Sequence, residues 1–292
     1  MTNSARKVGI LSPGDMGGAT GAMLHKHGID VYTCLEGRSA LTRTIATEAG
    51  FIDTPSVDEL VKTVDVLLSI LVPSEAYGLA ERVAEAMKRT GAHPVYVDCN
   101  AIAPQTVEKI EAVIRGAGAE FIDAGIIGGP PEEGMGTTFY CSGPETSAFE
   151  ELGNHGIAVK VVGPKVGQAS GLKMVYAAST KGTTALWTEL MVAARAMGLE
   201  TALMDEFGDN HPIVQRNLRS IPGMAHKAGR WVGEMEEIAA TFEGLGMTPK
   251  ILDGAADMYR FVKSTPLGNL TSRDPHPSLD EVLETLVTNR GE

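Results

Sequence analysis

One face of a predicted helix near the middle of the chain carries a lysine and hydroxyl side chains. Each residue of a helix is rotated by about 100° from its neighbour, so Ala177, Thr180 and Thr184 fall within about 40° of Lys173. Tyr176 flanks this stripe and is a candidate substrate contact. The rest of the helix is mostly apolar, and such a stripe is unusual for a helix buried in a core. The pattern favours the wall of a ligand-binding cleft.

A glycine-rich turn lies close to the N-terminus. It joins a strand predicted over 8–11 to a helix predicted over 19–27. A strand, tight turn and helix start in this order place backbone N–H groups and the positive end of a helix dipole under a pyrophosphate. The first glycine of G-x-G-x-x-G is a serine here, so a tight turn in some other α/β protein is the alternative. The predicted dinucleotide contacts in the turn are Ser12, Gly14, Asp15, Met16 and Gly17.

An acidic residue at the end of the next predicted strand supports the dinucleotide. Glu36 follows Gly17 by 19 residues, where an acid binds the ribose 2′-OH of NAD. Its carboxylate would repel a 2′-phosphate, whereas Arg38 and Ser39 could bind one. The cofactor is therefore NAD or NADP, with a slight preference for NAD.

Two further predicted strands end in residues that could reach the cofactor. Leu71, Val72 and Pro73 end one strand and are predicted cofactor contacts. The alternative is that the proline simply ends the strand and has no role in binding. Asn100 ends the next strand and is expected beside the nicotinamide or the substrate, although asparagine is also a common turn former. Further along, the adjacent Gly128 and Gly129 could let backbone N–H groups approach a substrate, or could form a plain turn.

These residues need a parallel sheet to bring them to one edge. Short apolar runs alternate with amphipathic helical segments, which predicts crossover connections and a Rossmann-type doubly wound, mostly parallel sheet. Ser56 with Glu59 is a capping-box pattern, and Pro104 suits a first helical turn. The predicted strands span 8–11, 30–35, 66–71, 95–98 and 121–124, with 138–142 and 158–162 extending the sheet at its far edge.

The character of the sequence changes after Gly163, where strand patterns give way to helical ones. We expect an NAD(P)-binding domain over 1–164 and an all-α substrate and dimerisation domain over 165–292, with a cleft between them. Ser278 and Glu281 form a capping box before the last helix. Helices are predicted over about 166–196, which connects the domains, and over 205–218, 224–245 and 250–262.

Composition excludes several classes of protein. A formal charge of −12 argues against binding to nucleic acid or to an anionic membrane. The three cysteines are far apart and lack metal-ligand spacing, so we expect no disulfide, no metal site and a cytoplasmic location. We also expect no signal peptide and no membrane span.

Several motifs together resemble the β-hydroxyacid dehydrogenase and 6-phosphogluconate dehydrogenase superfamily. They are the turn at 14–17, the strand ends at 72–73 and 98–104, the segment 123–129 and the helix around Lys173. The stretches 173–182 and 230–238 are similar to the branch that has a 6-phosphogluconate dehydrogenase-like C-terminal domain of unknown function. The resemblance covers nearly the whole chain, and its motifs specify the superfamily and branch but no substrate.

The resemblance implies hydride transfer between a nicotinamide and a hydroxylated small molecule, a secondary or primary alcohol or a hydroxy acid. Lys173 matches the family's catalytic lysine, which takes the hydroxyl proton as hydride leaves. Such an amine must be partly neutral at the working pH, which burial in an apolar cleft can achieve. A surface lysine with its charged end in water is the alternative.

Two departures from the family pattern bear on the substrate. The family's asparagine four residues after the lysine is Ala177, so Thr180 or Asn100 would have to orient the substrate. The family's serine before the paired glycines is Ile127, which lines the expected substrate site without a hydroxyl. Both changes favour a bulkier or less acidic alcohol than a simple 3-hydroxy acid.

Two other functions remain open on the sequence. Imine reductases share this architecture but generally lack the lysine, and a cofactor-binding sensor would bind the dinucleotide without turnover. We also expect a homodimer through the helical domain, as in the family that the chain resembles.

Overall fold

A sheet of eight strands occupies the N-terminal half of the chain in the computed structural model, which describes residues 6–134, 136–208, 211–271 and 274–291. The chain divides into two compact units, 1–174 and 175–292. The first unit contains the sheet with helices around it, and the second is helical throughout. The predicted fold class is confirmed. No helix among the described residues combines the length and apolar character needed to cross a bilayer.

The sheet has the strand order β3-β2-β1-β4-β5-β6-β7-β8, and each pair is parallel except β6 with β7. The strand order reverses direction beside β1, which is where doubly wound sheets bind ligands. Two predicted strands were too long, three were too short, two of them by a single residue, and β3 was not predicted. The strands are β1 (Lys7–Leu11), β2 (Asp30–Thr33), β3 (Ile52–Asp53), β4 (Val66–Ser69), β5 (Val95–Asp98), β6 (Phe121–Ile127), β7 (Thr138–Ser142) and β8 (Ala158–Gly163).

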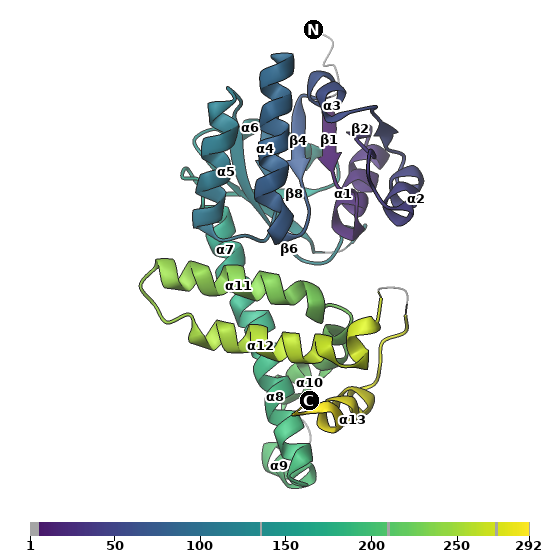
Figure 1. The fold of residues 1–292 in the computed structure, drawn as a ribbon, viewed down its shortest axis with the longest axis vertical. Coiled ribbons are helices and arrows are strands. Elements are labelled where there is room, and N and C mark those ends of the chain that lie inside the picture. Colours follow the sequence, from purple (N-terminus) through teal and green to yellow (C-terminus); the bar gives the residue numbers. More distant parts are fainter. Residues whose placement is uncertain (1–5, 135, 209–210, 272–273, 292) are drawn as a thin grey trace. The chain divides into compact units, whose positions relative to one another are not determined.

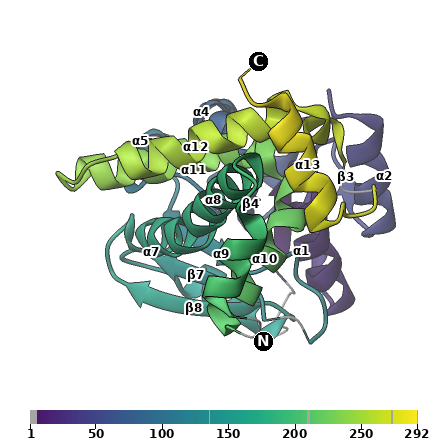
Figure 2. The same cartoon turned by 90° about the horizontal axis from the view of Figure 1, so that it is seen from below.

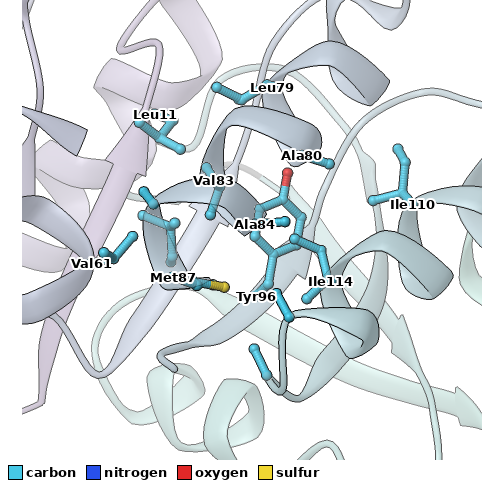
Figure 3. Packing of buried hydrophobic residues seen from close by; sticks show 14 of the residues in the cluster. Leu11, Val61, Leu79, Ala80, Val83, Ala84, Met87, Tyr96, Ile110 and Ile114 are labelled. Carbon is cyan, nitrogen blue, oxygen red and sulfur yellow. The ribbon is translucent and has the colours of Figure 1, made fainter. Parts of the chain in front are cut away.

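Helices cover both faces of the sheet, and each face has its own hydrophobic core. Figure 3 shows the core beneath α4 and α5, where Tyr96 lies among apolar side chains. Ser56 caps α3 as predicted, and Pro104 begins α5. The helices are α1 (Asp15–Lys26), α2 (Ala40–Glu48), α3 (Val57–Thr63), α4 (Pro73–Thr90), α5 (Pro104–Gly116) and α6 (Ser147–Glu150), with a 3₁₀ turn at Glu151–Asn154.

The helical unit begins within α7 (Gln168–Ala177). A π turn at Ala178–Gly182 connects α7 to α8 without a break, so the long predicted helix is confirmed with one irregular turn. Figures 1 and 2 show α11 and α12 side by side. The remaining helices are α8 (Thr183–Ala196), α9 (Glu200–Phe207), α10 (Pro212–Ala225), α11 (Ala228–Gly244), α12 (Lys250–Ser264) and α13 (Leu279–Asn289), with a 3₁₀ turn at Pro266–Asn269.

The helix predicted over 205–218 was wrong, because two helices share this stretch. Gly208 ends α9 with a φ of +77°, and Pro212 opens α10 in the first-turn position that suits proline. The capping box of Ser278 and Glu281 at the start of α13 is confirmed in both of its hydrogen bonds.

Candidate functional site

The glycine-rich turn lies between β1 and α1, as the sequence predicted. Ser12 adopts a φ of +66°, a left-handed conformation that glycine adopts at much lower cost. The Gly14 N–H donates to the Ser12 carbonyl at 2.7 Å, and Gly14 is the N-cap of α1 but supplies no side chain to it. Asp15 and Met16 are the first residues of the helix. This end of α1 has the geometry that binds anions through backbone N–H groups.

The candidate adenosine end lies just after β2. Glu36 is exposed, and the partly exposed Arg38 follows it. Ser39 caps α2 by accepting a hydrogen bond from the Thr42 N–H. Arg43 donates to the carbonyl oxygens of Leu35 and Arg38, which fixes the loop between them. An acid and a base therefore stand two residues apart at the end of β2.

The ends of β4 and β5 are joined through one asparagine side chain. The Leu71 N–H donates to Asn100 Oδ1 at 2.7 Å, and Asn100 Nδ2 donates to Ser69 Oγ at 2.9 Å. Val72 is exposed, and Pro73 begins α4 behind it. Asn100 is only 2% exposed. Its amide therefore holds the backbone of the strand end in place.

Asp98 is the remaining member of this hydrogen-bond network. It accepts hydrogen bonds from the Asn100 N–H at 3.0 Å and from Asn100 Nδ2 at 3.1 Å. Burial raises the pKa of the Asp98 carboxyl to about 7, the two hydrogen bonds from Asn100 oppose this rise, and the charge of Asp123 adds to it. The short spacing of Asp98 and Asn100 is an Asx-turn pattern that the sequence already displays.

Four polar residues form a row across the sheet. Ser69, Asp98, Asp123 and Ser142 pair in register on β4, β5, β6 and β7, and each is fully buried. Buried polar groups are stable only when hydrogen-bonded. The row therefore joins the strand ends near the glycine-rich turn to the start of α7.

Asp123 binds the first turn of α7. Its Oδ2 accepts from the N–H groups of Gly167, Ala169 and Ser170 at 2.9, 3.0 and 3.1 Å. Ser142 Oγ donates to the same oxygen at 2.8 Å, and Ser170 Oγ donates to Oδ1. Burial raises the pKa of Asp123, and the hydrogen bonds from Ser170, Ser142 and Gly167 oppose the rise. Sequence analysis had assigned this residue no role, because its partners in α7 are 44 to 47 residues away.

Lys173 lies on α7 against β6. Its Nζ donates a hydrogen bond to the Ile126 carbonyl at 2.6 Å. Gly125 permits the close approach, because a Cβ there would lie 2.9 Å from both the Ala169 carbonyl oxygen and the Lys173 Cβ. The amine is therefore held one residue before the predicted substrate segment.

The predicted substrate segment begins at the end of β6. Ile127 is the last residue of the strand and is partly exposed. Gly128 has a φ of +128°, and a Cβ there would collide with Thr137. Thr137 Oγ1 donates to the Gly129 carbonyl at 2.8 Å. The two glycines thus form a fixed loop that starts next to the residue that accepts the lysine amine.

The stripe predicted on the long helix is interrupted by the π turn. This turn changes the rotation per residue, so the 100° rule fails beyond Ala177. Thr184 is buried and bonds to Ser220 within the helical unit, which contradicts its prediction as a cleft residue. Tyr176 is 46% exposed, and Thr180 Oγ1 donates to the Ala177 carbonyl at 3.2 Å.

The helical unit contains a buried ion pair that sequence analysis missed. Lys181, in the π turn, pairs with Glu234 on α11, and Arg230, one turn earlier on the same helix, reaches the same carboxylate at 3.3 Å. Trp231 lies 5.6 Å from the Lys181 amine. The Tyr259 hydroxyl donates to the Lys181 carbonyl, in the π turn. The 53 residues between Lys181 and Glu234 leave no local pattern to reveal them.

The structure was searched for side chains that could hold a metal ion together, over the residues that it describes. No group of three or more histidine, cysteine, aspartate or glutamate side chains is placed there to hold an ion. All three cysteines are free and buried.

Two family models match the sequence. The model of the NAD binding domain of 6-phosphogluconate dehydrogenase matches residues 7–155, and a domain of unknown function, DUF1932, matches residues 194–262. An uncharacterized 28.5 kDa protein of Methanothermus fervidus is 30% identical over 199 residues, which are 68% of this chain and 75% of that protein.

Solved structures extend the comparison. A conserved protein of unknown function, MTH1747, described as similar to 3-hydroxyacid dehydrogenases, is 27% identical with a TM-score of 0.68, over 88% of this chain and 96% of its own. The 3-hydroxyisobutyrate dehydrogenase of Mycobacterium tuberculosis, solved with L-serine, shares the fold with a TM-score of 0.70 at 17% identity, over 97% and 99% of the two chains. An imine reductase from Myxococcus stipitatus also shares it, with a TM-score of 0.54 at 18% identity, over 96% and 100%.

Proposed function

Because the chain belongs to the family that has the NAD binding domain of 6-phosphogluconate dehydrogenase, we propose that it is an NAD(P)-dependent oxidoreductase acting on a hydroxylated small molecule. The substrate class is a secondary or primary alcohol, including hydroxy acids. The observation that carries the proposal is the position of Lys173, whose amine is held beside the Gly128–Gly129 loop at the end of β6.

The residues of the first unit fit a dinucleotide. The turn at Ser12–Gly17 directs the start of α1 toward an anion, as pyrophosphate binding requires. Glu36 and Arg38 are exposed or partly exposed after β2, where the adenosine ribose of such cofactors binds. Asn100 holds the Leu71–Pro73 strand end that would lie along the cofactor. When bound, the nicotinamide accepts or supplies the hydride.

Lys173 is proposed as the general acid and base. In alcohol oxidation its neutral amine takes the hydroxyl proton while the carbon-bound hydrogen leaves as hydride, and in ketone reduction the ammonium returns that proton. The Ile126 carbonyl holds the nitrogen in place through a hydrogen bond from Nζ. Gly128 and Gly129 could present backbone N–H groups to the substrate, while Ile127, Tyr176 and Thr180 are the remaining proposed contacts.

The nucleotide preference follows from the charges after β2. Glu36 accepts hydrogen bonds from a ribose 2′-OH and repels a 2′-phosphate, so we keep a slight preference for NAD. Arg38 acts in the opposite direction. Proteins that share this fold have been solved both with NADP⁺ and with NAD⁺, so the direct comparison is a pair of Kd values for NADH and NADPH.

Imine reduction is the second candidate, because imine reductases have the same fold. Lys173 speaks against it, since that class generally lacks a lysine there. A spectrophotometric screen of NADH and NADPH oxidation with ketones, aldehydes and cyclic imines, and of the reverse reaction with alcohols, separates the two. Turnover of alcohols or ketones is expected. Turnover of imines alone would replace the proposal, and tight NADH binding without any turnover would favour a cofactor sensor.

The assembly that we propose is a homodimer formed through the helical unit, in the cytoplasm. Exposed apolar side chains on that unit, such as Leu186, Ile213 and Ile251, support it. Sedimentation equilibrium at micromolar concentration is expected to give the mass of two chains. A monomer would contradict the proposal.

A further inference from the structure

Strand β6 holds α7 at two places one helical turn apart. Asp123 binds the N–H groups of the first turn, and the Ile126 carbonyl binds the Lys173 amine. Ala169 and Lys173 are four residues apart, so both face β6. A helix fixed at a single point could still rotate about its axis or slide. Contacts at two levels define both its rotation and its position along the strand.

The anchor is an unusual one for a helix start. A serine or threonine N-cap satisfies first-turn N–H groups at little cost, whereas a buried carboxylate is costly unless its oxygens are saturated with hydrogen bonds. Asp123 accepts five, from Ser142, Gly167, Ala169 and, through both its N–H and its hydroxyl, Ser170. An ionised carboxylate at the positive end of a helix dipole forms stronger hydrogen bonds than a neutral cap. Asp123 therefore accepts more backbone N–H groups of this turn than a serine or threonine N-cap does.

Three positions of β6 set the distance between this strand and α7. Asp123, Gly125 and Ile126 contact α7 through a carboxylate, through the space left by a missing Cβ, and through a carbonyl oxygen. A displaced first turn would move Ala169 and Lys173 together, because they belong to one rigid helix.

We propose that Asp123 is a positioning residue for Lys173, which holds the amine at the end of β6 by anchoring the first turn of α7. The proposal rests on the proposed role of Lys173 but can be tested without turnover. Ser142 and Ser170 are lesser members of the anchor, because the side chain of each gives the carboxylate a single hydrogen bond.

The test uses the whole protein and trace acetic anhydride, which acetylates accessible neutral amines. Mass spectrometry compares the labelling rate of Lys173 with that of exposed Lys160 in the same sample. In Asp123→Asn an N–H₂ group or a neutral oxygen replaces the charged acceptor. We expect the Lys173 to Lys160 ratio to rise at least fivefold as the amine leaves the Ile126 carbonyl, and the amides of Ala169 and Ser170 to exchange hydrogen at least tenfold faster.

Asp98→Asn is the matched control. Asp98 is the neighbour of Asp123 in the polar row and is equally buried, but among the described residues it accepts hydrogen bonds from Asn100 and not from α7. We expect its Lys173 labelling to stay within twofold of the wild type. If Asp123→Asn does not fold, Ser170→Ala and Ser142→Ala decide, with smaller changes of the same sign expected.

Unchanged Lys173 labelling in a folded Asp123→Asn variant overturns the inference. If Asp123→Asn does not fold, unchanged labelling in both serine variants does so. Either result holds even if the α7 amides exchange faster, since Asp123 would then only cap the helix. Where the screen has found a substrate, positioning predicts a lower kcat in Asp123→Asn with the KM for NADH within threefold. The proposed function fails on a different result, namely turnover that persists when Lys173 itself is removed.

Discussion

Asp98 and Asp123 are direct partners across β5 and β6, and both are fully buried. Oδ2 of Asp123 accepts hydrogen bonds from three backbone N–H groups, which can only donate and so favour the ionised carboxylate. Asp98 accepts hydrogen bonds from Asn100 alone among the described residues. Two neighbouring carboxylates in a dry site do not both ionise easily. The hydrogen bonds therefore favour the negative charge on Asp123, and Asp98 is the member of the pair that holds a proton below about pH 7.

Stability should reflect this proton. Asp98 keeps its proton up to about pH 7 in the folded chain, whereas the unfolded chain releases it near pH 4. Unfolding therefore releases a proton between these values, and the contribution of Asp98 to stability falls as pH rises through this window. The linkage amounts to about 3 kcal/mol between pH 5 and pH 8. Urea unfolding followed by circular dichroism gives the free energy of unfolding at each pH. This free energy should fall with rising pH more steeply in the wild type than in Asp98→Asn, and equal slopes in the two proteins would contradict the prediction.

The buried pair of Lys181 and Glu234 should be costly to break. Glu234→Leu leaves an uncompensated ammonium in the helical unit, which costs about 3–5 kcal/mol, and adding Lys181→Met should restore most of the loss. Both tryptophans, Trp187 and Trp231, lie in this unit, so tryptophan fluorescence during urea unfolding reports on it.

Arg230→Ala is the control for this pair. The Arg230 side chain contacts the same carboxylate but is half exposed, so its removal should lower the free energy of unfolding by less than about 1 kcal/mol. A Glu234→Leu variant that is no less stable than Arg230→Ala would show that the buried pair contributes little.

The left-handed Ser12 stores strain that glycine would not. Ser12→Gly should stabilise the protein by up to about 1 kcal/mol, because a non-glycine residue in this region pays about that amount. Ser12→Ala keeps the Cβ and is expected to give no gain. Thermal unfolding of the two variants compares them, with NADH affinity expected to stay within threefold. A Ser12→Gly variant that is less stable than Ser12→Ala would contradict this prediction, because both variants lack the hydroxyl and only alanine keeps the strained Cβ.

Charges after β2 should set the choice of nucleotide. Glu36→Gln removes a repulsion and should tighten NADPH binding severalfold, while Arg38→Ala should weaken NADPH more than NADH. Titration of cofactor fluorescence measures the six Kd values, for two cofactors with the unaltered protein and each variant. If the unaltered protein binds NADPH tenfold more tightly than NADH, the preference for NAD is withdrawn.

Much of the fold was accessible from the sequence because local signals agree there. The strands at 95–98 and 138–142 were predicted to the residue, since buried apolar runs end at polar residues. The two-residue strand β3 was missed, because Ile52 and Asp53 are exposed and too few to show a period. The split of α9 from α10 could have been recognised from Gly208 and Pro212, whose breaker signals the apolar pattern outweighed.

The candidate site divides in the same way. The turn at Ser12–Gly17 and the glycines at 128–129 are contiguous motifs, so the sequence displays them. The hydrogen bonds of Asp123 to α7, and of Glu234 to Lys181, join residues far apart along the chain, and only the three-dimensional fold reveals them. Asn100 was noted as a polar strand end, but its burial against Ser69 depends on the neighbouring strand.

In the proposed reaction the Lys173 amine moves the proton that accompanies hydride transfer. The most direct measurement is kcat/KM of Lys173→Met with the best substrate from the screen, together with its Kd for NADH. Loss of a general acid and base predicts a fall of about 10²–10⁴-fold in kcat/KM with the Kd within threefold. A variant that binds NADH normally and retains kcat/KM within tenfold of the wild type would show that Lys173 does not move the proton.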